Sequence, residues 1–89
     1  AEQAAARRER EREREKALAK QQAEQKALLN FRIKQLQAEI EEYDACEEDL
    51  RRDNPPEVVD GMMEEVYCMR TRAQEKLVKL EEQLARLDW

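Results

Sequence analysis

The feature that most constrains the fold is the segment Asn54-Pro55-Pro56, because it interrupts a helical pattern that runs on both sides of it. Proline inside a helix costs about 3 kcal/mol, and it also drives the preceding residue out of the helical region. The sequence therefore predicts one helix over about residues 5–52 and a second over about residues 56–87. Two helices joined by so short a break form a hairpin of antiparallel neighbours.

The same segment favours the start of the second helix. Asn54 is a good N-cap, and Pro55 suits the first helical position, where a missing N–H costs nothing. Glu57 follows the cap by three residues, as in a capping box. We therefore expect Asn54 to cap the second helix.

Apolar residues on each side of the break recur at alternating spacings of three and four. That is the heptad pattern of a coiled coil, in which one stripe of each helix faces its partner. We call these stripes the first and second seams. The first seam comprises Leu29, Ile33, Leu36, Ile40, Tyr43, Glu47 and Leu50. The second seam comprises Val59, Met63, Val66, Arg70, Ala73, Leu77, Leu80, Leu84 and Leu87. The predicted fold class is all-α, with two long helices in an antiparallel coiled-coil hairpin.

Each seam contains one charged residue, Glu47 in the first and Arg70 in the second. A charge at such a position usually fixes the register at a cost in stability. One possible register sets Leu36 against Arg70. The register that we prefer sets Leu36 against Leu77 and Tyr43 against Arg70, so that the guanidinium lies across the Tyr43 ring. We expect Glu47, Arg70 and Tyr43 to set the register.

The preferred register has consequences for both ends of the hairpin. It lengthens the turn to about residues 53–60 and moves the entry of the second helix to Asp60-Gly61. It also brings Trp89 level with residue 24. We therefore expect residues 1–25 to be an overhanging, charged helical extension, and residues 26–89 to form the hairpin.

Five large side chains outside the seams are candidates for binding a partner protein: Leu28, Phe31, Met62, Tyr67 and Met69. Met-rich helical surfaces that contain Tyr suit protein contacts. One seam is a thin core for a chain of 89 residues, and the Leu28–Phe31 pair faces away from it. We therefore expect a homodimer in which the first helix of each chain contacts the other.

Catalytic chemistry is not expected, because the chain has no His, no Ser and a single Thr. Two Cys residues, Cys46 and Cys68, do not make a zinc site and are expected to remain thiols in the cytoplasm. Residues 39–65 hold twelve acidic and two basic side chains, a net charge of −10, which repels nucleic acid and anionic lipid. No apolar run is long enough for membrane insertion. We expect no cofactor, metal or nucleic acid.

The expected function is therefore a non-enzymatic coiled-coil scaffold, which mediates self-association or binds a helical partner. The absence of an initiator Met suggests that it is part of a longer cytoskeletal, motor or trafficking protein. A second possibility remains open. The order of heptad helix, Asn-Pro turn and heptad helix over about residues 26–89 is similar to that of Rho-binding helical hairpins. That resemblance implies a small GTPase as the partner.

Overall fold

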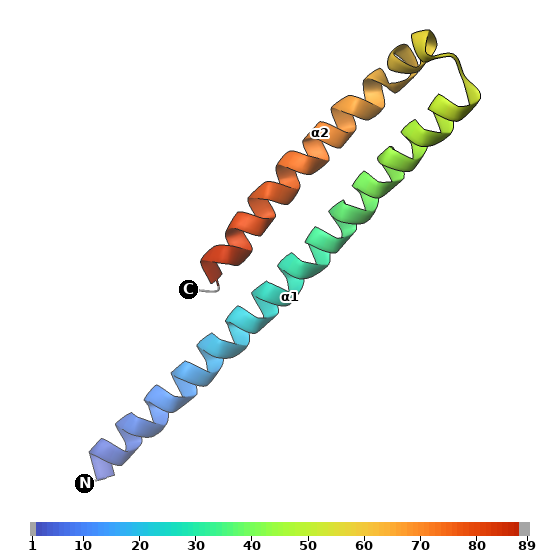
Figure 1. Ribbon diagram of the computed structural model, residues 1–89. Coiled ribbons are helices and arrows are strands. Elements are labelled where there is room, and N and C mark those ends of the chain that lie inside the picture. The colour runs from blue at the N-terminus through green and yellow to red at the C-terminus, as the bar shows by residue number, and fades with distance from the viewer. Residues whose placement is uncertain (1, 88–89) are drawn as a thin grey trace.

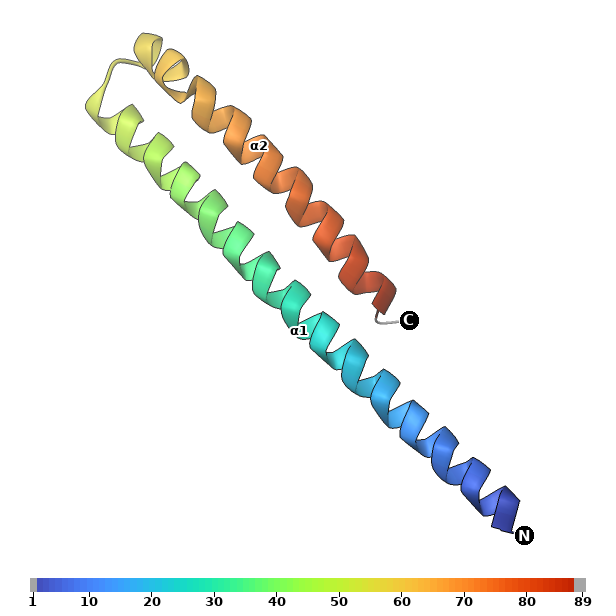
Figure 2. The same cartoon turned by 180° about the vertical axis from the view of Figure 1, so that it is seen from behind.

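The computed structural model describes residues 2–87 and shows two helices, α1 (Glu2–Asp53) and α2 (Pro56–Leu87). They lie side by side and run in opposite directions (Figures 1 and 2). No strand occurs within the described residues. The predicted all-α hairpin is confirmed. The prediction that Trp89 lies level with residue 24 concerns a residue outside the described part of the chain. Neither described helix has a stretch apolar and long enough to cross a membrane.

The molecule is a thin rod, with extents of 81 × 16 × 15 Å. At 1.5 Å per residue, the 52 residues of α1 account for roughly 78 Å of that length. Helix α2, with 32 residues, stops part-way along α1. Residues 3–24 of α1 are all exposed and have no segment of α2 beside them (Figure 1). They form the overhang that the sequence predicts.

The core follows the two seams. Its buried residues are Leu29, Ile33, Val59, Met63 and Ala73. Every other seam residue is half-buried, including the charged Glu47 and Arg70. Val59 and Met63 are fully enclosed, so the best-packed part of the core lies near the turn. Toward the open end of the hairpin, Leu80, Leu84 and Leu87 are only partly covered.

The turn differs from the prediction by one residue. Asn54 ends α1: its backbone N–H donates to the carbonyl oxygen of Leu50 at 3.0 Å, and its side-chain Nδ2 donates to the same oxygen at 3.1 Å. Pro56, rather than Pro55, is the first residue of α2, and Val58 N–H donates to Pro55 O at 3.1 Å. The expected N-cap of the second helix therefore caps the C-terminus of the first. Its side-chain amide gives the Leu50 carbonyl at the end of α1 a second donor.

The preferred register is correct, but the long turn that we attached to it is wrong. Arg70 lies beside Asp44 and Glu47, as that register requires, and not beside Leu36. Yet α2 is helical from Pro56, so Asp60-Gly61 is inside the helix. The link between the helices rises beyond the end of α1 before α2 begins (Figure 1), which supplies the offset without a longer loop.

Candidate functional site

One side of the hairpin is closed by a network of polar side chains, which we call the polar cluster: Asp44, Glu47, Arg51, Asp60, Tyr67 and Arg70. Arg70 Nη1 lies 2.9 Å from Asp44 Oδ1 and 3.3 Å from Glu47 Oε1. Tyr67 OH lies 3.3 Å from Glu47 Oε2 and accepts a hydrogen bond from Arg51 Nη2 at 3.2 Å. These contacts connect α1 to α2 over two helical turns.

The charges of the cluster reinforce one another. The hydrogen bond from Arg70 lowers the pKa of Glu47 below its ordinary value, and the same bond raises the pKa of Arg70. Burial, followed by the negative charge of Glu47, raises the pKa of Tyr67. Glu47 is therefore held ionised and Tyr67 neutral. The cluster therefore links the two helices.

Tyr43 occupies a different place from the one expected. The guanidinium of Arg70 lies over the ring of Tyr67, with 5.1 Å between Cζ and the ring centroid. Tyr43 instead donates a hydrogen bond to Glu39, one turn back on its own helix, and this bond raises the pKa of Tyr43. Tyr67 precedes Arg70 by three residues, so the two share a face of α2. Asp44 and Glu47 draw the guanidinium toward that face.

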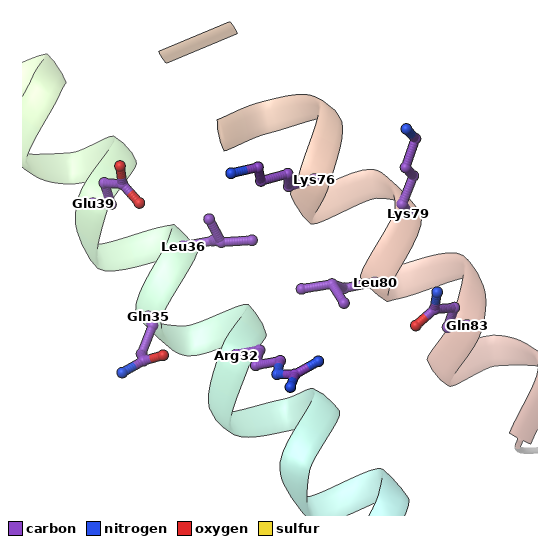
Figure 3. Close-up of a pocket in the computed structure, with 8 residues that line it drawn as sticks. All are labelled: Arg32, Gln35, Leu36, Glu39, Lys76, Lys79, Leu80 and Gln83. Atoms are coloured by element: carbon purple, nitrogen blue, oxygen red, sulfur yellow. The ribbon is translucent and has the colours of Figure 1, made fainter. Parts of the chain in front are cut away.

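The other side of the hairpin is open. Three adjoining hollows run along it, and we call them together the lateral groove. The central hollow, of about 440 Å³, has Leu36 and Leu80 as its floor. These two side chains point toward each other between the helices, with Lys76 and Gln83 nearby on α2 (Figure 3). Leu36 and Leu80 are half-buried seam residues, so the seam itself is accessible here.

The flanking hollows share residues with the central one, which makes the groove continuous. The end hollow, of about 350 Å³, has Leu29 and Leu87 as its floor and shares Gln83 with the central hollow. The hollow toward the turn, of about 210 Å³, shares Leu36, Glu39 and Lys76. The residues of the polar cluster line none of these hollows. Met69 follows Tyr67 by two positions, and their side chains therefore leave α2 about 160° apart.

The structure places the five candidate partner residues in different surroundings. Leu28 is 51% exposed at the rim of the end hollow, and Met69 is 43% exposed where it lines the hollow nearest the turn. Met62 is 51% exposed and, seven residues from Met69, shares its face of α2. Phe31 is 59% exposed and lines no part of the groove. Tyr67 lies on the opposite side, inside the polar cluster.

The sequence did not predict that the groove leucines form a binding surface, because residues at seam positions are expected to be buried in the core. A sign was present in the sequence. The residues that flank the leucines on this side are mostly long and polar: Gln25, Arg32, Lys76, Gln83 and Arg86. Side chains of that kind keep their polar ends in water while their stems border the apolar floor.

Nothing in the described residues gathers three side chains that could hold a metal ion. Cys46 and Cys68 are both free and exposed. Compared with protein-family models, curated proteins and solved structures, the chain gives no significant match.

Proposed function

We propose that the protein is a non-enzymatic interaction module, whose lateral groove receives a helix of a partner protein. The observation that supports this proposal is the accessibility of the seam leucines along the groove. A third helix laid along the groove would bury Leu36, Leu80 and Leu87 more completely than two helices do. Helix-in-groove binding uses this kind of apolar floor with a polar rim.

The hairpin is suited to this role because its two sides differ. The polar cluster ties α1 to α2 on one side, so the helices keep their spacing without a partner. The groove side has fewer cross-links and retains uncovered apolar surface. Binding there would need no rearrangement of the hairpin, which lowers its cost. Free, exposed thiols suit a reducing compartment, and we propose a cytoplasmic location.

Photo-crosslinking tests the proposal. A photoreactive residue in place of Gln83, which lines two hollows, should form adducts with helical segments when the protein is irradiated in an extract of cells that express it. The control places the same residue at Glu48, which is exposed and outside the groove. Adducts formed equally at both positions, or at neither, would refute a binding groove.

The second candidate is a hairpin that binds a small GTPase of the Rho type. It is favoured by Phe31, whose ring is exposed on the outer face of α1 and outside the groove. Calorimetry with a GTP-loaded Rho-type protein tests it. Binding that is lost on Phe31→Ala and kept on Gln83→Ala would support this function over the groove.

A further inference from the structure

We propose that the occupant of the groove is a second copy of this chain, packed antiparallel about a twofold axis. In that dimer Met62 and Met69 of each copy insert into the two leucine-floored hollows of the other. This inference rests on the proposed function, since it assumes that the groove binds helices. It adds the identity of the partner, its direction and its register.

The first argument is spacing. Met62 and Met69 are exposed, lie on the groove side of α2 and are seven residues apart, roughly 10.5 Å along the helix. The floors of the two hollows, Leu36 with Leu80 and Leu29 with Leu87, are also seven residues apart on each helix. The two projecting side chains therefore match the separation of the two hollows. Flexible thioether side chains fill such irregular spaces well.

The second argument is that a single alignment of the two copies places both methionines in hollows of the other copy. Asp44 faces Arg70 and Glu47 faces Tyr67, so the numbers of facing residues add up to 114. Each α2 residue can therefore be given the number of the α1 residue that faces it, and we call this number its height along the rod. On this scale Met69 lies at about height 45 and Met62 at about height 52. The hollows lie at about heights 35 and 28. A twofold axis at about height 40 brings Met69 to the first hollow and Met62 to the second at once.

The third argument is charge. Residues 39–65, at the turn end, carry a net charge of −10, whereas the rim of the two hollows carries Arg32, Lys76, Lys79 and Arg86. Antiparallel packing sets each acidic end against a basic one, and parallel packing would set the two acidic ends together. The axis at height 40 stacks α2 on α2 and brings Glu65 within one helical turn of Arg86 of the other copy.

The fourth argument is that the same surface serves both copies. A twofold interface must be complementary to itself. Here the methionines and the hollows lie on one side of one hairpin, so each copy supplies both. The faces that remain outside the interface are the polar cluster and the outer face of α1, where Phe31 lies.

Sedimentation equilibrium of the 89-residue chain gives the first test. The wild type should dimerise at micromolar concentration, and the double variant Met62→Glu, Met69→Glu should weaken the dimer at least about tenfold, because two carboxylates would enter apolar hollows. Both sites are exposed in the single chain, so its helicity should persist. Phe31→Glu is the matched control and should leave the dimer intact. Loss of the dimer with Phe31→Glu alone would overturn the proposal in favour of the outer face.

Charge reversal tests the register. Arg86→Glu and Glu65→Arg should each weaken the dimer about threefold to tenfold, and the two together should restore most of the loss, because the pair is re-formed with its signs exchanged. Additive losses would mean that these residues do not meet.

Small-angle scattering tests the arrangement. With the axis at height 40, the two overhangs project from opposite ends, and the dimer should be roughly 115 Å long. An α1–α1 dimer centred on Leu28 and Phe31 would be roughly 85 Å long, close to the 81 Å of one chain. A length near 85 Å would overturn the groove dimer.

A wild type that stays monomeric at high micromolar concentration would also overturn the proposed dimer. It would leave the binding groove itself to be decided by the adducts formed at Gln83. The two proposals therefore fail on different measurements.

Discussion

Arg70 of α2 and Asp44 of α1 lie 2.9 Å apart, Nη1 to Oδ1, at a point where a regular heptad would place an apolar side chain on α2. Glu47, in the facing seam, accepts a second bond from the same guanidinium at 3.3 Å. The side chains of Arg70 and Glu47 are 22% and 20% exposed. The pair is therefore partly withdrawn from water, and each member depends on the other.

We predict that Arg70→Leu and Glu47→Leu are each destabilising, because each leaves a half-buried charge without its partner. The double variant should be at least as stable as the wild type, since two apolar residues restore a regular seam. Thermal unfolding followed by circular dichroism measures this. If the two single effects simply add in the double variant, the pair is not coupled.

The same double variant should lose register specificity. Spin labels at Arg32 and Glu82, which are level with each other in the observed register, report it. A narrow, short distance in the wild type should broaden in the double variant, because leucine no longer excludes the alternative alignment.

A pH dependence follows from Glu47. Its pKa is lowered in the folded protein, chiefly by the hydrogen bond from Arg70, so its contribution to stability is present above the ordinary value of 4.5 and is lost as the pH falls below it. Glu47→Gln should therefore be less stable than the wild type at pH 7, and the difference should close in acid. Melting temperatures of the two proteins from pH 7 to pH 3 test this. A difference that does not change with pH would show that the carboxylate charge contributes nothing.

Val59 and Val78 allow the same substitution at two extremes of burial. Val59 is fully enclosed, whereas Val78 is 53% exposed. Val59→Ala should cost roughly 2 kcal/mol, from lost apolar burial and the cavity that remains. Val78→Ala should change the free energy of unfolding by no more than about 0.5 kcal/mol. Urea unfolding of both variants measures the difference, and equal effects would mean that the turn end is not packed as described.

Gly61→Ala should stabilise the protein by about 0.5–1 kcal/mol. Gly61 is inside α2, has no positive φ and has nothing within 4 Å of the place where a Cβ would lie. Alanine removes backbone freedom from the unfolded chain without meeting a neighbour. Urea unfolding checks the sign. A loss of stability would indicate that the chain bends at Gly61, as it would if α2 began there.

Both cysteines should react with a thiol reagent in the native protein, in the absence of reductant, because both are free and exposed. Their rates should respond differently to concentration. Cys46 shares a face of α1 with Glu39, which lines the groove, while Cys68 lies on the outer side of α2. Dimerisation through the groove should slow the labelling of Cys46 and leave that of Cys68 unchanged.

The heptad pattern was sufficient to predict the hairpin and its register. The preferred register sets Leu36 against Leu77, and the contacts of Arg70 agree with that alignment. The turn was less predictable. Asn54 has equal chemical reason to cap the helix before it or the helix after it, and the two adjacent prolines suit either arrangement.

The heptad pattern could not predict how the two sides of the hairpin differ. Periodicity identifies which residues face the partner helix, but it does not say which flank will be covered. Tyr67 and Met69 both border the second seam, yet one joins the polar cluster and the other lines the groove. That outcome depends on Asp44 and Arg51, which come from the other helix and are fixed only when the hairpin closes.

Because α1 and α2 differ in length, the end of α2 marks a defined position along α1. Leu87, at the end of α2, lies beside Leu28 and Leu29, roughly 39 Å along the axis from the start of α1. A fluorophore attached at the end of α2 would therefore lie part-way along α1, while one attached at the start of α1 would lie at the end of the rod. The distance between two such fluorophores on one chain would measure the length of the overhang, and bending of the overhang would shorten that distance.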